Sequence, residues 1–258
     1  MPELSASFLL TDRLQRLHKS MDPATAVSVC APAGYGKTTL AVSYFIHQAA
    51  EPCRIAWYRL DPEDNNTPVF IAHLTEALFP SEDAEFAESR QTLESRTDLR
   101  LQPHQALIRI CREMWALHSR GEYTRTYLVL DDFQNVAQNQ DICDITRYML
   151  DNLPPSCSIF VLSRAYHDVF TEKQKLEKRI IEINADDLAF SSAEIEDLML
   201  SMGQAAANRK LTDSIAKTTE GWIAGIIILW QAVKGRNLET AAMESSHLIN
   251  KDALFRYM

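Results

Sequence analysis

The stretch A-P-A-G-Y-G-K-T-T, residues 31–39, decides which fold this chain adopts. It matches the pattern G-x-x-x-x-G-K-[ST], except that Ala31 stands at the first glycine position. In a loop of this type, successive backbone N–H groups point inward at a phosphate. Gly34 and Gly36 permit that backbone path, and the small Ala31 still lets the loop leave a strand. The stretch therefore predicts a P-loop that binds a nucleoside triphosphate.

Each residue type in this loop has a chemical role. Lys37 supplies a positive charge for the β- and γ-phosphates, and the Thr38 hydroxyl is a ligand for Mg²⁺. An accidental glycine-rich turn is the alternative, but a strand before the loop and a helix after it favour the P-loop. The residues that we expect to contact the nucleotide are Ala33, Gly34, Tyr35, Gly36, Lys37, Thr38 and Thr39.

Outward from the loop, strands alternate with helices. The apolar, β-branched runs predict strands over 24–30, 54–60, 126–132, 158–164 and 179–184. Helical spacing predicts helices over 12–20, 37–49, 67–79 and 102–119. Such alternation implies an α/β fold, in which helices cover both faces of a parallel sheet. Residues 81–98 hold six acidic residues and two arginines with few large apolar side chains, and we expect a mobile surface excursion there.

After residue 190 the pattern is helical throughout. Ser191 and Glu194 form an S-x-x-E capping box, and further helices are predicted over 206–218, 221–235 and from 250 to the end. We therefore expect an α/β domain over 1–188 and a small helical lid domain over 189–258. The last residues, K-D-A-L-F-R-Y-M, still follow a helical pattern, so we expect the lid to be incomplete and the chain to be part of a larger protein.

A second motif, L-V-L-D-D, occupies residues 128–132. An acid at the carboxyl end of a buried strand beside the P-loop strand can hold Mg²⁺, and Asp131 has that place. Asp132 is then positioned to orient or deprotonate the attacking water. The alternative is a solvated pair of aspartates at a strand end. Because the P-loop lies upstream, the catalytic interpretation is favoured.

A third candidate is Arg164, the last residue of the strand predicted over 158–164. Ligands of parallel sheets bind beyond the carboxyl ends of the strands, so Arg164 could reach a γ-phosphate and report its presence. A solvated strand-end arginine is the alternative that the residues alone leave open.

Composition narrows the function classes. The 258 residues carry a formal net charge of −9, which makes the chain a poor candidate for holding DNA by charge. The longest apolar run, 223–230, is too short to cross a bilayer, and no secretory signal is visible. Five scattered cysteines favour a reducing compartment, so we expect a cytoplasmic protein. Neither an H-E-x-x-H zinc motif nor a G-x-S-x-G serine hydrolase motif is present.

An ordered set of motifs resembles one known family. Together with the P-loop, the motifs are W-Y-R-L-D-P-E-D-N-N (57–66), L-V-L-D-D-F (128–133), V-L-S-R (161–164), D-L-A-F-S-S-A-E-I (187–195) and T-E-G-W-I-A-G-I (219–226). From about Phe8 to its end, the chain resembles the MalT-type signalling ATPases. These are the large ATP-binding LuxR-family transcriptional regulators of the STAND class, whose P-loop NTPase fold is similar to that of AAA+ proteins.

The resemblance implies roles for particular residues. Lys37 and Thr38 match the P-loop lysine and the magnesium ligand, Asp131 and Asp132 match the acidic pair, and Arg164 matches a sensor arginine at the γ-phosphate. E-G-W-I-A-G-I is similar to the G-L-P-L stretch of related ATPases. That similarity implies that Trp222 or Ile223 contacts adenine. Arg13 resembles a residue that frames the base from the amino-terminal side.

The resemblance also implies a switch. In such proteins the ADP form is a closed monomer, and ATP with an inducer opens it so that the protomers assemble and activate transcription. We therefore expect ATP or ADP with Mg²⁺, slow hydrolysis, self-association in the ATP state, and an inducer and DNA bound through regions outside this chain. The alternative is a P-loop enzyme such as a small-molecule kinase or a motor ATPase. A degenerate P-loop that binds nothing is a third hypothesis, which the intact Lys37, Thr38 and Asp131 oppose.

Overall fold

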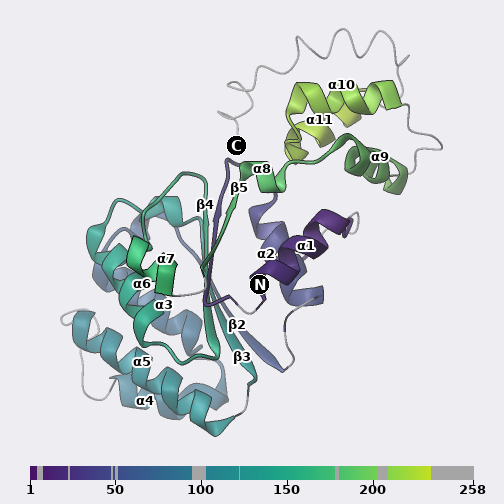
Figure 1. The fold of residues 1–258 in the computed structure, drawn as a ribbon. Coiled ribbons are helices and arrows are strands. Elements are labelled where there is room, and N and C mark those ends of the chain that lie inside the picture. Colours follow the sequence, from purple (N-terminus) through teal and green to yellow (C-terminus); the bar gives the residue numbers. More distant parts are fainter. Residues whose placement is uncertain are drawn as a thin grey trace.

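A five-stranded parallel sheet forms the centre of the molecule (Figure 1). The computed structural model describes residues 1–4, 8–22, 24–47, 49, 52–94, 103–121, 123–177, 180–202 and 209–233. The strands are β1 (Ala26–Cys30), β2 (Cys53–Arg59), β3 (Arg125–Asp131), β4 (Cys157–Ser163) and β5 (Ile180–Asn184). All five predicted strands are confirmed, each to within two residues at either end.

The strand order is β2-β3-β4-β1-β5, which corrects one expectation. We expected the strand that ends in Asp131 to lie beside the P-loop strand. Instead β4 lies between β1 and β3 and pairs with both. Crossover connections do not reveal strand order in a sequence, so this prediction had no local signal to rest on. The correction brings the end of β4, and with it Arg164, between the P-loop and the two aspartates.

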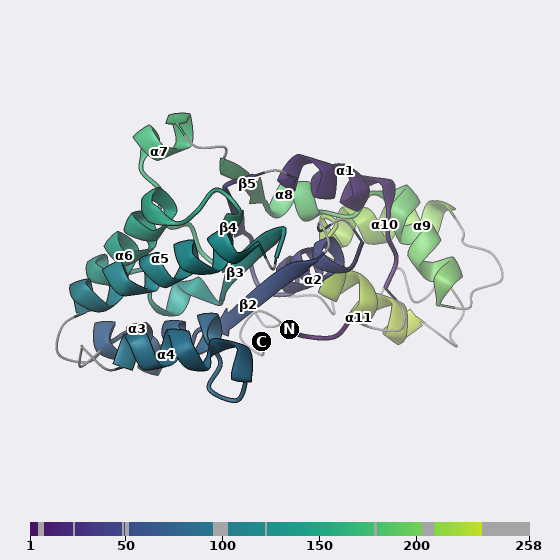
Figure 2. The same cartoon turned by 90° about the horizontal axis from the view of Figure 1, so that it is seen from below.

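Helices cover both faces of the sheet (Figures 1 and 2). On one face lie α1 (Asp12–Met21) and α2 (Lys37–His47), and on the other lie α3 (Thr67–Leu78), α5 (Pro103–Arg120) and α6 (Gln140–Asn152). Alternate strand residues serve the two layers: Leu128 packs on the α3 side, whereas Val129 packs on the α2 side. The shorter elements are α4 (Ala87–Glu94), α7 (Glu172–Glu177), α8 (Ala185–Leu188) and the 3-10 turns η1 (Pro62–Asp64), η2 (Ala84–Phe86) and η3 (Phe133–Asn135).

The segment expected to be a mobile excursion is folded over residues 81–94, so that expectation was wrong there. Phe86 is only 2% exposed and belongs to the larger hydrophobic core. The Arg54 guanidinium lies 4.0 Å from the centroid of the Phe86 ring, and Arg90 bonds Glu76 and the carbonyl of Phe79. One aromatic anchor with two arginine contacts holds an otherwise acidic segment in place. The rest of the predicted excursion, residues 95–98, lies outside the described residues.

Three further helices lie together at the end of the sheet where β5 leads into α8 (Figure 1). They are α9 (Ser192–Ser201), α10 (Arg209–Thr219) and α11 (Ile223–Val233), and we call them the lid. The predicted capping box is confirmed, because Ser191 and Glu194 bond each other's backbone N–H groups. The lid has its own apolar cluster, which includes Ile195, Ile226 and Trp230.

Two further predictions about the lid remain without a test. The boundary near residue 188 stays a prediction, and the predicted helix from 250 to the end lies outside the described residues.

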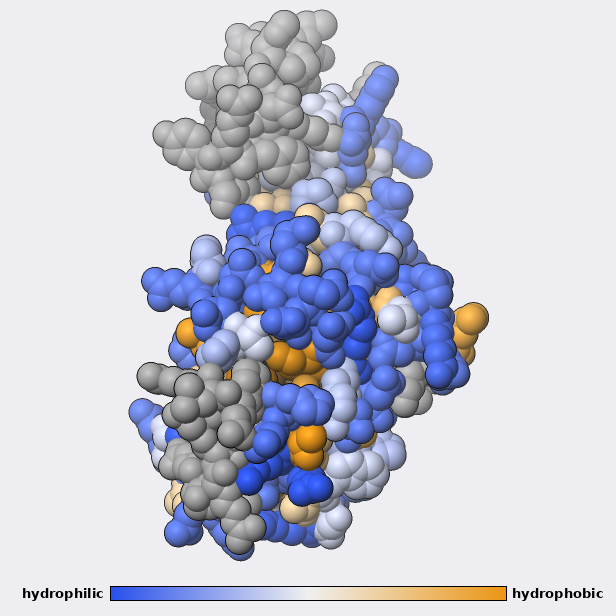
Figure 3. All heavy atoms as spheres, turned by 90° about the vertical axis from the view of Figure 1, so that its left-hand side faces the viewer, coloured by the Kyte–Doolittle hydropathy of each residue, from blue (hydrophilic) through white to orange (hydrophobic). Residues whose placement is uncertain are grey.

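None of the described helices combines the length and apolar character needed to span a membrane. The face on the left in Figure 1 is mainly hydrophilic, and apolar residues appear there only in small groups (Figure 3).

Candidate functional site

The P-loop connects the end of β1 to the start of α2. Ala31 extends the sheet, since its N–H donates to the carbonyl of Ser163 at 3.1 Å. Gly34 and Gly36 have φ values of 76° and 86°, in the left-handed region that favours glycine. Ala31 has a negative φ, so an alanine fits there without strain. The geometry thus explains why this loop keeps its two inner glycines but not the first one.

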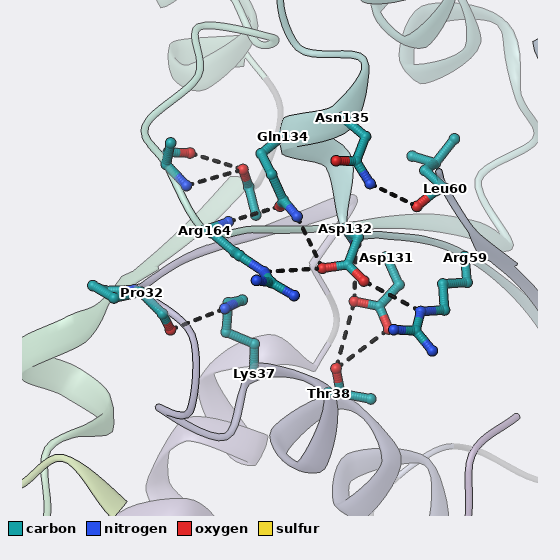
Figure 4. A network of polar contacts seen from close by, with 12 residues as sticks. Pro32, Lys37, Thr38, Arg59, Leu60, Asp131, Asp132, Gln134, Asn135 and Arg164 are labelled. Carbon is teal, nitrogen blue, oxygen red and sulfur yellow. Dashed lines mark hydrogen bonds and ion pairs between the residues drawn. The ribbon is translucent and has the colours of Figure 1, made fainter. Parts of the chain in front are cut away.

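Lys37 and Thr38 begin α2 directly below the loop (Figure 4). Lys37 Nζ donates to the carbonyl oxygens of Ala31 at 2.7 Å and Pro32 at 3.1 Å. Burial lowers the pKa of Lys37, as does the nearby Arg164, while the two aspartates raise it. The ammonium group is therefore held inside the curve of the loop, where a phosphate would meet it.

Asp131 ends β3 and faces Thr38. The Thr38 Oγ1 atom lies 3.3 Å from Oδ2 of Asp131 and 3.5 Å from Oδ1. Asp131 is 5% exposed, and burial together with the charge of Asp132 raises its pKa. The Asp132 N–H and the Thr38 hydroxyl oppose that rise. A buried carboxylate beside a hydroxyl is an oxygen donor set of the kind that Mg²⁺ takes from a protein when phosphates supply other ligands.

Asp132 is held by three side chains rather than facing solvent. Its backbone is left-handed (φ 58°, ψ 39°), an unusual conformation for a residue that is not glycine. Arg59 Nε lies 3.2 Å from Oδ2, and Arg164 Nε lies 3.4 Å from Oδ1. Gln134 donates to Oδ1 at 2.9 Å. Burial raises the pKa of Asp132, but Gln134 and the two arginines outweigh it and lower the pKa.

Gln134 and Arg59 are site residues that the sequence did not single out. Gln134 connects two candidates, because its Oε1 also accepts the backbone N–H of Arg164 at 2.9 Å. Figure 4 shows Arg59 and Arg164 reaching Asp132 from opposite sides. Arg59 follows W-Y at the end of a strand, so its position at the carboxyl edge could have been noticed. Gln134 contacts Asp132 and Arg164 because the left-handed backbone at Asp132 turns the chain into η3.

These residues line an open polar hollow of about 510 Å³ at the carboxyl ends of β2, β3 and β4. Its lining residues are Arg59, Leu60, Asp61, Asp132, Gln134, Asn135 and Arg164. Two guanidinium groups, those of Arg59 and Arg164, and two carboxylates, those of Asp61 and Asp132, line this hollow, and Lys37 lies near Asp132.

A second cavity, of about 440 Å³, lies on the other side of the P-loop. Its lining is mostly apolar and comes from the chain start, α1, α2 and the lid. Of the predicted contacts, Arg13, Tyr35, Gly36, Thr38, Thr39 and Ile223 line it, and Phe8 and Phe190 were not predicted. An apolar cavity next to a phosphate loop suits a flat aromatic ring such as a nucleobase.

Arg13 links α1 to the lid at the edge of this cavity. Its Nε lies 2.9 Å from a carboxylate oxygen of Glu194, and its Nη1 donates to the carbonyl of Asp187 at 2.9 Å. Its guanidinium also lies 4.9 Å from the centroid of the Phe190 ring. The residue expected to frame a base therefore also fastens the lid to the amino-terminal helix.

Trp222 and Ile223 differ in position. Ile223 lines the apolar cavity, whereas Trp222 is fully buried and does not line it. The Trp222 indole N–H donates to the carbonyl of Ala33 in the P-loop at 2.9 Å. Of the two residues proposed for adenine contact, the structure thus brings Ile223 to the cavity and Trp222 to the loop backbone.

Comparisons with known proteins agree with this geometry. The profile of the family described as Nephrocystin 3, N-terminal, matches residues 5–164, which is more than half of the chain. The chain belongs to this family. The match runs from the segment before α1 to Arg164, so it includes the P-loop, Asp131 and Asp132 and leaves the lid outside.

Among curated proteins, the HTH-type transcriptional regulator MalT of Vibrio parahaemolyticus is 25% identical over 229 residues. The MalT of Vibrio campbellii is 24% identical over the same length. Both matches cover 88% of this chain but only 24% of the relative, so the chain spans about a quarter of their length. The resemblance to MalT-type regulators is therefore confirmed.

Solved structures show the same fold at low identity. A Walker-type ATPase of Pyrococcus abyssi is similar with a TM-score of 0.58 and 13% identity, over 95% of this chain and 73% of that one. A STAND protein with a tetratricopeptide repeat sensor from Pyrococcus horikoshii follows with a TM-score of 0.52 and 12% identity, over 96% and 33%. The α/β P-loop fold, a parallel sheet of the type found in AAA+ and STAND ATPases, is thus confirmed.

Proposed function

We propose that this chain is the nucleotide-operated switch of a larger signalling regulator. It binds ATP or ADP with Mg²⁺ through residues 33–39 and hydrolyses ATP slowly. The presence of the γ-phosphate sets the position of the lid. The ATP state favours self-association, and an inducer and DNA bind through parts of the protein outside these 258 residues.

The observation that carries the proposal is the meeting of Thr38 and Asp131 beside Lys37. A lysine and a hydroxyl from the P-loop motif meet a buried carboxylate from the end of β3, more than 90 residues later in the chain. Thr38 and Asp131 would hold Mg²⁺, which would neutralise charge on the β- and γ-phosphates. The apolar cavity on the other side of the loop, with Ile223 and Arg13 in its wall, would take the base.

Asp132 supports a slow rather than a fast reaction. A general base must be able to accept a proton from water, yet Asp132 is paired with Arg59 and Arg164 and has a lowered pKa. Arg164 would turn to the γ-phosphate when ATP is bound, which would loosen its hold on Asp132. Hydrolysis would then depend on a rearrangement of ion pairs, and such a slow step suits a signalling switch better than a metabolic enzyme.

Identification of the nucleotide that stays bound through purification, followed by single-turnover kinetics, tests the proposal. We expect retained ADP or ATP and turnover below about 1 s⁻¹, near the lower limit of ordinary enzyme rates. As a control, Asp144→Asn should retain the same nucleotide and the same turnover as the wild type, because Asp144 pairs with Arg147 on α6 and does not line the polar hollow. Rapid phosphoryl transfer to an added small molecule would instead establish a kinase and contradict the switch.

A further inference from the structure

The lid touches the P-loop through the loop's own backbone. The indole N–H of Trp222 donates to the carbonyl of Ala33 at 2.9 Å, and the N–H of Ala224 donates to the carbonyl of Gly34 at 3.2 Å. Two consecutive carbonyl groups of the phosphate loop thus accept hydrogen bonds, one from Trp222, which directly precedes α11, and one from Ala224 in its first turn.

The fold constrains Trp222 on every side. The residue is fully buried, and a Cβ at Gly225 would lie 2.5 Å from its ring. Gly221 has φ 76°, and a Cβ there would lie 2.6 Å from the backbone nitrogen of Phe190. The backbone of Glu220, which precedes Gly221, is also left-handed, with φ 52°. Two glycines and a left-handed turn therefore fix the position from which the indole reaches the loop.

The two carbonyl groups belong to peptide units that a bound phosphate would share. The carbonyl of Ala33 is in the same planar unit as the N–H of Gly34, and the carbonyl of Gly34 is in the same unit as the N–H of Tyr35. A P-loop presents such N–H groups to the phosphate. A hydrogen bond accepted by the carbonyl polarises the unit and makes its N–H a stronger donor.

We propose that Trp222 is a positioning residue for phosphate, and that it acts through the Ala33–Gly34 peptide while the Ala224 N–H acts through the next one. The lid then increases the affinity of the loop for phosphate. By reciprocity, phosphate increases the strength with which the loop holds the lid. This inference rests on the proposed function, because it concerns the same nucleotide site.

The test compares Trp222→Phe with Trp230→Phe in the full 258-residue chain. Phenylalanine keeps an aromatic ring but lacks the N–H donor. Trp230 is a suitable control in the same lid, since it lies on α11, is buried, and its indole N–H has no hydrogen-bond partner among the described residues. We expect Trp222→Phe to weaken ADP binding roughly 3-fold, because the Gly34 N–H becomes a weaker and less firmly positioned donor to phosphate, and to change adenosine binding less than twofold. Trp230→Phe should change neither.

Equal affinity of ADP for Trp222→Phe and the wild type would overturn the inference. Equal losses for ADP and adenosine would also overturn it, because they would indicate a reshaped base cavity. A second measurement needs no variant: ADP should slow hydrogen exchange at the Ala224 amide of the wild type, and adenosine should not. Unchanged exchange with bound ADP contradicts the inference alone, whereas a wild type that binds no ADP contradicts the proposed function.

Discussion

The two cavities on either side of the P-loop are built in different ways. The polar hollow around Asp132 is made by the ends of three neighbouring strands and one short turn, all within the α/β core. The apolar cavity is assembled from the chain start, α1, α2 and two lid helices, segments that are far apart in sequence. The first therefore keeps its shape as long as the sheet is intact. The second changes whenever the lid moves.

This difference assigns separate tasks to the two sides. Under the proposed function, ion pairs in the polar hollow would distinguish a γ-phosphate from its absence, because the charges there are close and partly buried. Contacts in the apolar cavity would hold the base, and they would depend on Arg13, which fastens the lid through Glu194. A nucleotide that spans both cavities would connect phosphate chemistry to lid position. Variants that affect only one side would test that separation.

Lys37→Ala should have the largest effect. Loss of the ammonium group inside the loop should weaken ATP binding roughly 100-fold or more, because charge-assisted contacts to phosphate are among the strongest hydrogen bonds. Adenosine binding should stay within about threefold, since Lys37 does not line the apolar cavity. Calorimetric titration of both ligands measures this. The control is Lys175→Ala, whose ammonium pairs with Glu172 and Glu182 instead. Unchanged ATP affinity would show that the P-loop assignment is wrong.

Asp132→Asn should act on turnover rather than on binding. Removal of the carboxylate that could accept a proton should slow hydrolysis roughly 100-fold, the lower range of general-base effects. ATP affinity should change less than about fivefold, because Asp131 and Thr38 remain. Single-turnover release of phosphate measures the first, and titration measures the second. A rate equal to that of the wild type would exclude Asp132 as the base and direct attention to Gln134.

The sequence predicted one side of this comparison much better than the other. The P-loop, its strand and the acidic pair were found because their residues are close in sequence and their backbone needs are specific, as at Gly34 and Gly36. The strand-end position of Arg59 could have been noticed, but its place beside Asp132 depends on strand order, and that of Gln134 depends on the left-handed turn at Asp132. Both are properties of the folded chain rather than of a motif.

The apolar side was harder to predict for a related reason. Periodicity predicted each lid helix, but it could not show that Trp222 turns to the loop and Ile223 to the cavity. That choice follows from packing of Trp222 against Gly225. The folded segment around Phe86 was missed because its acidic composition conceals a single buried anchor. Contacts between distant segments carry no local signature.

Arg164→Ala should reduce the preference for ATP over ADP. The guanidinium lies at the polar hollow and pairs with Asp132, so its loss removes a positive charge from the γ-phosphate side. We expect ATP affinity to fall roughly 10-fold and ADP affinity to change little, consistent with one charged hydrogen bond. Arg120→Ala is the control, because Arg120 ends α5 and pairs with Glu88. Equal losses for both nucleotides would contradict a sensor role.

Acid pH should destabilise the packing of α1 on α2, two helices that line the apolar cavity, through protonation of His18. This buried histidine joins α1 to α2 by a bond of 2.9 Å between Nε2 and the Ser43 hydroxyl. Burial, with a smaller effect from His47, lowers the pKa of His18 to about 4. The unfolded chain then takes up the proton first, so stability is lost as pH falls from about 6.5 toward 4.

The measurable consequence is a difference in slope between two chains. The free energy of unfolding of the wild type should fall faster with acid than that of His18→Gln, by up to about 1.4 kcal/mol per pH unit. Glutamine can still bond Ser43 but does not titrate. Denaturant titrations at several pH values measure the slopes. Parallel slopes would mean that folding does not lower the pKa of His18, which would contradict the prediction.

Ile223→Ala should have the smallest effect and is the counterpart of Lys37→Ala. Ile223 lines the apolar cavity from the first turn of α11, and its shortening removes apolar surface that would pack against a base. Affinity should fall about 3- to 5-fold, because partial burial of two or three methyl or methylene groups stabilises by about 1 kcal/mol. The fold-loss in affinity should be the same for ATP, ADP and adenosine. Lys37→Ala, in contrast, should weaken ATP much more than adenosine. Ile228→Ala, at an exposed site of the same helix, should change none. A loss confined to ligands with phosphates would show that Ile223 acts on the loop, as Trp222 does, and that the two cavities are not independent.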